Sequence, residues 1–346
     1  MRKLFLFLSF LFCFFAVFAQ PNRVLFIGNS YTYVNSLPDL ISSMYAASGE
    51  EFEYAMSAPG GCTFQQHCTV SLPYIQQGSW DYVVLQEQSQ LPSFPDNQFM
   101  QESYPYAAEL CSLIRQYNPN AHIVFYMTWG RKNGDAQNCP YFPPLCTYEG
   151  MDSLLYARYM LISADNHTCV SPVGAAWHSI REQHPEKELY QSDESHPSYF
   201  GSYVAACSFY TSLTGRDPLN IAWNGTLSDA DALIAKNAVK KVVYDSLAKW
   251  CFEDDTISDD STIVIDYIND PFNLYPNPVS TTLHINFPED GKKSSVMIIG
   301  TDGKVYQLTG LDTDQTLDVS RFPNGVYLLC LNVGNNSYVK SFIISH

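Results

Sequence analysis

The stretch Val24-Leu25-Phe26-Ile27-Gly28-Asn29-Ser30 decides the fold of the first part of this chain. Four apolar residues run directly into a glycine, an asparagine and a serine, and a helical pattern begins soon afterwards. Such a pattern is typical of a buried strand that ends in a turn toward a helix. We therefore expect residues 24–27 to form a strand that carries Ser30 just beyond its carboxyl end.

The region 20–252 continues this strand-to-helix pattern. Further strands are expected at 52–56, 82–85, 123–128 and 169–173, and helices at 37–47, 100–117, 151–162, 197–213 and 229–250. Alternating strands and helices predict an α/β fold, in which a parallel sheet has helices on both faces. Sites in such sheets form beyond the carboxyl ends of the strands. Ser30, Gly61 and Gln86 each follow an expected strand, so we expect the three segments to meet in one crevice.

A second informative stretch lies far downstream, at Asp193-Glu194-Ser195-His196-Pro197. A serine hydroxyl needs a neighbouring base before it can attack a carbonyl carbon. His196 can supply that base through Nε2, while Asp193 accepts the Nδ1 proton and fixes the tautomer. The sequence therefore predicts a catalytic triad of Ser30, His196 and Asp193.

Together these motifs resemble the SGNH (GDSL-like) hydrolase superfamily over roughly residues 22–252. The run Gly28-Asn29-Ser30 resembles the first block of that family, and residues 58–63 resemble its second block. The resemblance implies a three-layer, flavodoxin-like sandwich and an oxyanion hole built from the Ser30 and Gly61 N–H groups. The third block, Gly-x-Asn-Asp, is absent, and residues 85–90 stand in its place. The amide of either Gln86 or Gln88 could donate the third hydrogen bond.

The resemblance also implies the activity. Family members cleave acyl esters, and many exported members remove acetyl groups from polysaccharides. We therefore expect a secreted serine esterase that acts on a small-molecule or glycan ester, such as a carbohydrate O-acetyl ester, without a cofactor. The alternative is a catalytically silent cell-surface protein of the same fold that binds glycans or acts as an adhesin.

Residues 271–346 differ in character from the region before them. Short alternating segments at 283–287, 295–299 and 326–331 predict strands of a small antiparallel β-sandwich, and turn residues separate them. With Tyr275-Pro276-Asn277-Pro278 and the final Lys340-Ser341-Phe342-Ile343, this region resembles the C-terminal sorting domain of the type IX secretion system. The resemblance implies the secretion machinery as a partner. The alternative is an ordinary adhesive or carbohydrate-binding sandwich.

The amino terminus and the composition also indicate export. Arg2 and Lys3 precede an apolar run that ends near Ala19, so residues 1–19 are expected to be a signal peptide. No later stretch is apolar enough to predict a transmembrane segment in the mature chain. Residues 253–270 are rich in Asp, Ser and Thr and are expected to be an acidic linker.

The net charge of −16 argues against nucleic acid as a partner. The expected location is outside the cell or on its surface, reached through the periplasm.

Cysteines complete the sequence evidence. An even number in an exported domain favours disulfides over a metal site, because no pair has the Cys-x-x-Cys spacing of a zinc ligand set. Two short-range pairs, Cys62–Cys68 and Cys139–Cys146, are the candidate bridges, and no metal site is expected. The cysteines of the region 20–252 are Cys62, Cys68, Cys111, Cys139, Cys146, Cys169, Cys207 and Cys251.

Overall fold

The computed structural model of the chain describes residues 22–252, 273–286, 294–300, 305–309, 316–333 and 336–346. The expected signal peptide, residues 1–19, and the expected linker, residues 253–270, lie outside these ranges. Both therefore stay predictions.

Residues 22–252 are built on a five-stranded sheet in the order β2-β1-β3-β4-β5, and every neighbouring pair is parallel. The strands are β1 (Asn22–Ile27), β2 (Phe52–Ser57), β3 (Tyr82–Leu85), β4 (His122–Tyr126) and β5 (Cys169–Ser171). Val24 to Ile27 are fully buried. A strand covered on both faces is apolar at successive positions, which is why the run 24–27 lacks polar alternation. The predicted α/β class with a parallel sheet is confirmed.

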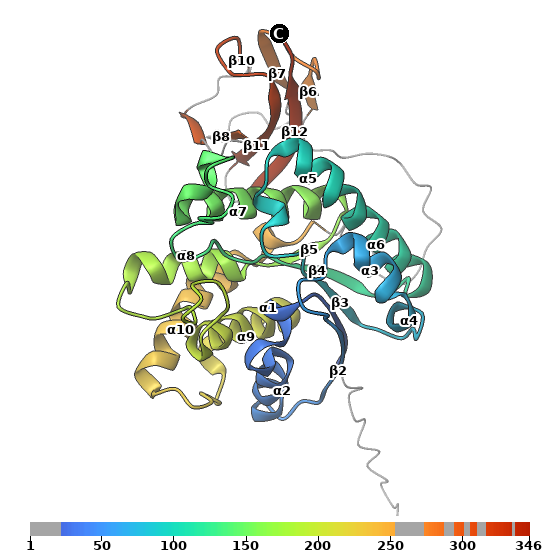
Figure 1. Ribbon diagram of the computed structural model, residues 1–346, viewed down its shortest axis with the longest axis vertical. Coiled ribbons are helices and arrows are strands. Elements are labelled where there is room, and N and C mark those ends of the chain that lie inside the picture. The colour runs from blue at the N-terminus through green and yellow to red at the C-terminus, as the bar shows by residue number, and fades with distance from the viewer. Residues whose placement is uncertain (1–21, 253–272, 287–293, 301–304, 310–315, 334–335) are drawn as a thin grey trace, which may run out of the picture.

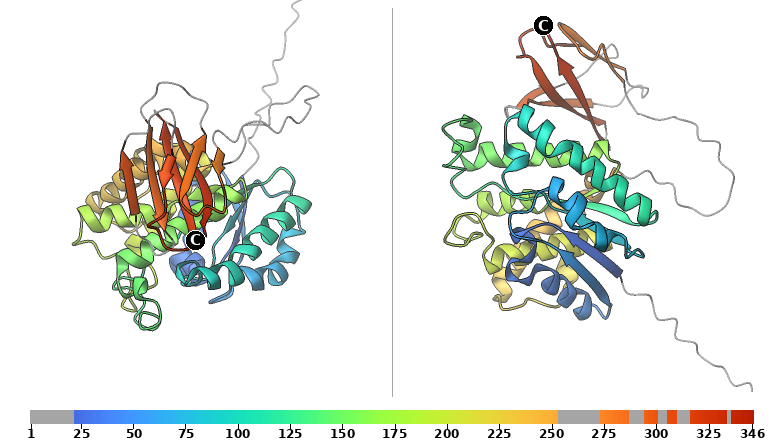
Figure 2. Two further views of the ribbon diagram at one scale, coloured as in Figure 1. Left: turned by 90° about the horizontal axis from the view of Figure 1, so that it is seen from above. Right: turned by 45° about the vertical axis from the view of Figure 1, so that its right-hand side comes forward.

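Helices cover both faces of this sheet (Figure 1). One layer contains α2, α9 and α10, in which α2 packs on α9 and α9 on α10, and the opposite layer contains α3, α6 and α7. The two layers are also separated in the second panel of Figure 2. The α-helices are α1 (Ser30–Tyr33), α2 (Leu37–Ala47), α3 (Phe64–Val70), α4 (Leu72–Ile75), α5 (Asp96–Glu102), α6 (Tyr104–Tyr117), α7 (Tyr148–Asp165), α8 (Val173–Gln183), α9 (Tyr199–Thr214) and α10 (Asp229–Val242).

Two expected helices are interrupted. The helix predicted over 100–117 is divided between α5 and α6 at Ser103, whose φ of −128° is not helical. Pro105 lies in the first turn of α6 and has no N–H with which to continue a helix from α5. The helix predicted over 229–250 ends as α10 at Val242, and a 3-10 helix follows at Tyr244–Trp250.

The C-terminal region forms two antiparallel sheets. One has the order β10-β7-β6 and the other β12-β11-β8-β9. Their strands are β6 (Asn273–Tyr275), β7 (Thr282–Asn286), β8 (Ser294–Gly300), β9 (Val305–Thr309), β10 (Thr316–Asp318), β11 (Gly325–Val333) and β12 (Asn336–Ile344). Buried Leu283, Ile298, Leu329 and Phe342 belong to a core of its own. The predicted small antiparallel unit is confirmed.

The disulfides agree only in part with the prediction. Cys139–Cys146 is bridged as expected. The Cys62–Cys68 prediction is wrong, because both residues are free thiols. Spacing alone suggested that pair, but Cys68 lies inside α3, where its Sγ is 4.0 Å from the carbonyl oxygen of Tyr106 in α6.

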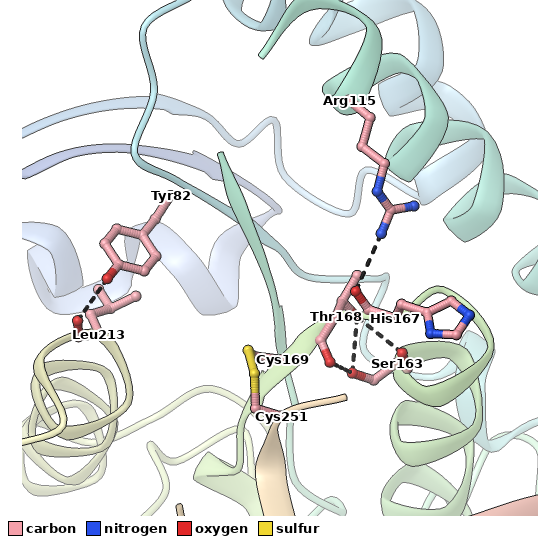
Figure 3. Close-up of a disulfide and its surroundings, with 8 residues drawn as sticks. All are labelled: Tyr82, Arg115, Ser163, His167, Thr168, Cys169, Leu213 and Cys251. Atoms are coloured by element: carbon pink, nitrogen blue, oxygen red, sulfur yellow. Dashed lines mark hydrogen bonds between the residues drawn. A yellow bond between two sulfur atoms is a disulfide. The ribbon is translucent and has the colours of Figure 1, made fainter. Parts of the chain in front are cut away.

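A second bridge, Cys169–Cys251, was not predicted. It joins the start of β5 to the end of the 3-10 helix at Tyr244–Trp250 (Figure 3). The Phe252 N–H also donates to the Thr168 carbonyl at 3.0 Å. The last described residues of the α/β unit are thus fixed to the amino-terminal edge of its sheet.

Among the described residues, no helix is both long enough and apolar enough to cross a membrane.

Candidate active site

Ser30 is the first residue of α1 and follows β1 after a two-residue turn. Asn29 caps α1, with its side-chain oxygen accepting from the Tyr31 N–H at 3.2 Å. Gly28 has no room for a side chain, because an added Cβ would lie 2.3 Å from Thr32 Oγ1 and 2.7 Å from Gln86 Oε1. The glycine lets the turn pack closely on its neighbours, which holds Ser30 at the carboxyl edge of the sheet.

The structure brings the three predicted triad residues together. His196 Nε2 lies 2.8 Å from Ser30 Oγ, and His196 Nδ1 lies 2.5 Å from Asp193 Oδ2. With Nδ1–H donating to Asp193, Nε2 is left to accept the Ser30 hydroxyl proton. The fold thus brings together Ser30 and His196, which are 166 residues apart in the sequence.

Asp193 is held in a tight turn of the same loop. Its Oδ1 accepts from the Ser195 N–H at 3.1 Å and from the His196 N–H at 3.0 Å. Burial acts to raise the pKa of the Asp193 carboxyl, but the hydrogen bonds from His196 and the Ser195 backbone outweigh it and hold that pKa below its usual value. Asp193 is therefore ionised at neutral pH and oriented toward the imidazole.

An aromatic stack that the sequence analysis did not predict supports this loop. The Tyr31 ring stacks on Trp129 with centroids 4.8 Å apart, and Trp129 stacks on Trp177 at 3.7 Å. Tyr31 Oη lies 2.6 Å from Ser195 Oγ, and Trp129 Nε1 donates to the Ser195 carbonyl at 3.1 Å. The edge of Tyr31 also faces the His196 ring. These contacts fix the backbone immediately before His196.

Gly61 lies in a turn closed by the Cys62 N–H, which donates to the Pro59 carbonyl at 3.1 Å. Its φ of +70° is in the left-handed region that favours glycine. Asn29 Nδ2 donates to the Cys62 carbonyl at 3.2 Å, which joins this turn to the residue before Ser30. Within residues 22–252 the N–H groups of Ser30 and Gly61 donate to no other protein atom. Both are therefore available to a ligand.

The two glutamines are placed differently from each other. Gln86 is fully buried, its Oε1 accepts from the Asn29 N–H and Thr32 Oγ1 at 2.9 Å each, and its Nε2 donates to the Glu87 carbonyl. Gln88 is half-buried, and its Nε2 donates to Gln90 Oε1 at 3.2 Å. Neither amide donates to Ser30 among the described residues. Gln86 instead braces the turn that carries Ser30, and the third oxyanion donor stays a prediction.

The described residues contain no group of three or more His, Cys, Asp or Glu side chains placed to hold a metal ion.

Comparison with known proteins identifies the tail. Residues 273–345 match a family described as the secretion system C-terminal sorting domain. The chain thus carries a type IX sorting domain and is a secreted or cell-surface protein. No curated protein sequence matches the chain.

Solved structures resemble the α/β unit. A DUF4886 family protein from Bacteroides uniformis has a TM-score of 0.55 at 16% identity, covering 66% of this chain and 95% of that one. A putative SGNH hydrolase from Slackia heliotrinireducens has a TM-score of 0.47 at 23% identity, covering 56% and 100%. An acetyl xylan esterase from Geobacillus stearothermophilus has a TM-score of 0.41 at 18% identity, covering 59% and 97%. The similarity to the DUF4886 family protein shows that the two proteins share a fold.

Proposed function

We propose that this protein is a secreted serine hydrolase that cleaves acyl esters through Ser30, His196 and Asp193. The observation that carries the proposal is the continuous chain of hydrogen bonds from Ser30 Oγ through His196 to Asp193. A chance neighbour of Ser30 would not also have its second ring nitrogen on a carboxylate that two backbone N–H groups hold in place.

The first half of the reaction transfers the acyl group to the enzyme. Ser30 Oγ attacks the ester carbonyl carbon while its proton passes to His196 Nε2. The resulting oxyanion accepts hydrogen bonds from the Ser30 and Gly61 N–H groups, each of which contributes on the order of 3 kcal/mol to lowering the barrier. His196 then gives its proton to the leaving alcohol oxygen, and the acyl group remains on Ser30.

The second half releases the acid. A water molecule gives a proton to His196 Nε2 as its oxygen attacks the acyl carbon, and the second tetrahedral intermediate collapses to free Ser30 Oγ, which regains the proton. Asp193 keeps its charge throughout and stabilises the imidazolium of both halves.

Substrates with a small acyl group on a large alcohol fit the exposure of this triad. The side chains of Asp193 and His196 are 47% and 31% exposed, so the triad lies at the molecular surface. A glycan chain can approach such a site from outside, and the sorting domain directs the protein out of the cell or to its surface. We therefore propose carbohydrate O-acetyl esters as the first substrates to test. A glycan-binding protein without turnover is the second candidate, but it would not need the Ser30–His196 hydrogen bond.

Three single variants test the proposal. Ser30→Ala and His196→Ala should each abolish hydrolysis of p-nitrophenyl acetate with the fold intact, and Asp193→Ala should be severe but weaker, since Asp193 orients the base without taking the proton. Double variants should be scarcely worse than the worst single one, because the three residues act as one unit.

A fluorophosphonate probe and a substrate series complete the test. The probe should label the wild type at Ser30 and fail to label Ser30→Ala. Acetate release from acetylated xylan should exceed hydrolysis of p-nitrophenyl decanoate if the acyl group is small. Wild-type turnover by Ser30→Ala would refute the serine-hydrolase proposal and leave the glycan-binding one.

A further inference from the structure

Glu87 lies beneath the proposed site and takes no part in the mechanism above. It follows β3 by one residue and is fully buried. Its Oε1 accepts from the Phe64 N–H at 2.8 Å and from the Gln88 N–H at 2.7 Å, and its Oε2 accepts from Ser103 Oγ at 2.7 Å. One carboxylate thus accepts from three donors, of which the two buried ones, on Phe64 and Ser103, belong to other segments of the chain.

These bonds join the loop after β3 to the segment that follows Gly61. Phe64 is the first residue of α3 and lies three residues after Gly61. The Glu87 carbonyl oxygen accepts from Asn29 Nδ2 at 3.4 Å, and the same Asn29 amide donates to the Cys62 carbonyl. The Gly61 turn is therefore held on one side by Asn29 and on the other by the bond from Phe64 to Glu87.

Among the described residues, no cationic side chain is paired with the Glu87 carboxylate. Burial raises the pKa of Glu87 to about 7, and the hydrogen bonds from Ser103, Gln88 and Phe64 only partly oppose this. The titratable groups around it are Tyr159 on α7, whose Oη accepts from the Glu87 N–H at 3.3 Å, Cys62 in the Gly61 turn and Cys68 on α3. Burial raises the pKa of all three, so they are neutral near pH 7. The Glu87 carboxylate therefore acts on the start of α3 and on Ser103 as a hydrogen-bond acceptor.

We infer that Glu87 is a positioning residue that sets the Gly61 N–H relative to Ser30 by anchoring the start of α3. The inference rests on the proposed function, because the Gly61 N–H matters only if an oxyanion forms there. A donor aligned to the transition state affects kcat more than KM. Loss of the anchor should therefore lower kcat and leave KM nearly unchanged.

Two variants of similar size separate the anchor from simple filling of space. Glu87→Gln keeps an oxygen for Phe64 and Gln88, and its amide group can donate to Ser103 Oγ. Glu87→Met fills the same volume without a strong acceptor. At pH 8 we expect Glu87→Gln to keep kcat for p-nitrophenyl acetate within about 3-fold of wild type, and Glu87→Met to lower it by about 10² with KM changed by less than about 3-fold.

Ser163→Ala is the matched control. Ser163 is fully buried and bonds to Thr168 at the amino-terminal edge of the sheet (Figure 3), at the end opposite to Ser30. It should lose stability and keep its kcat. Equal kcat values for folded Glu87→Met, Ser163→Ala and wild type would overturn the inference.

A second comparison applies if Glu87→Met does not fold. Glu87→Asp keeps the charge but withdraws the carboxylate from Phe64 and Ser103 by one methylene. Positioning predicts that Glu87→Gln is more active than Glu87→Asp, and the reverse order would show that charge, not position, is what matters. The proposed function is tested separately, since it fails only if the wild type neither turns over esters nor reacts with the fluorophosphonate.

Discussion

Two buried titratable residues that contact the turn before Ser30, Glu87 and His67, should oppose each other in the pH dependence of stability. Burial raises the pKa of Glu87 from 4.5 to about 7, and burial lowers the pKa of His67 from 6.5 to about 4. His67 lies under the same turn, with Nε2 at 2.9 Å from the Gly28 carbonyl oxygen and Nδ1 at 2.7 Å from Ser71 Oγ. Each pKa differs from its ordinary value by about 2.5.

The signs follow from which state binds the proton. Between pH 4.5 and 7 the unfolded chain has lost the Glu87 proton while the folded protein keeps it, so the free energy of unfolding falls as pH rises. Between pH 4 and 6.5 the unfolded chain holds a proton on His67 that the folded protein excludes, so the free energy of unfolding rises with pH. At about 1.36 kcal/mol for each pH unit, each group changes stability by about 3 kcal/mol in total, in opposite directions.

Glu87→Gln should expose the contribution of His67. In the wild type the two effects nearly cancel between pH 4.5 and 6.5. The free energy of unfolding of Glu87→Gln minus that of the wild type should therefore increase by about 1.4 kcal/mol for each pH unit between 4.5 and 7. For His67→Asn the same difference in the free energy of unfolding should decrease by a similar amount per pH unit between pH 4 and 6.5.

Urea unfolding followed by tryptophan fluorescence is the assay. All five tryptophans, at positions 80, 129, 177, 223 and 250, lie in the α/β unit, so the signal reports that unit within the full chain. Unfolding curves of wild type and both variants at half-unit steps from pH 4 to 8 give the differences directly. A difference between Glu87→Gln and wild type that stays constant from pH 4.5 to 7 would refute the reasoning about Glu87.

Two further predictions concern the scaffold. Replacing Cys169 and Cys251 by serine should lower the free energy of unfolding by about 4 kcal/mol, and replacing Cys139 and Cys146 should lower it by about 2 kcal/mol, because the bridges span 82 and 7 residues. Denaturant titration of both double variants measures these losses. A larger loss for the shorter loop would contradict the prediction. Gly28→Ala should disturb the turn before Ser30, because the added Cβ has no space. It should lower both the melting temperature and the rate of fluorophosphonate labelling. Unchanged labelling would contradict the tight packing around Gly28.

The sequence predicted the sheet because parallel strands covered on both faces carry their own signal. Residues 24–27 and 82–85 are apolar at successive positions, and helices lie between the strands, so class and strand positions could be inferred. Local motifs at a strand end and in a late loop also indicated Ser30 and His196 as candidate site residues. The Cys169–Cys251 bridge gave no such signal, since its two residues are brought together only by the folded sheet.

The role of the loop after β3 could not be predicted from the sequence. Resemblance to a family block directed attention to Gln86 and Gln88, whose amides resemble that of asparagine. In the structure the residue between them has the central place, because Glu87 reaches donors that belong to α3 and α6. The sequence shows an acidic residue two positions after the end of an apolar strand, but a carboxylate at that position is equally compatible with an exposed turn. Only the packing of Phe64 and Ser103 around it distinguishes the two.

If the proposed function holds, we expect Glu87 to give stability and activity opposite dependences on pH. Above pH 7 the carboxylate is ionised and is the strongest acceptor for Phe64 and Gln88, so the Gly61 turn is best anchored there. The same ionisation is what lowers the stability of the fold, because the charge is buried without a cation. An amide at this position keeps the acceptor and removes the buried charge. Glu87→Gln should therefore be more stable than the wild type at pH 8 while remaining active, and a variant that gained stability but lost kcat would show that the charge itself has a part in catalysis.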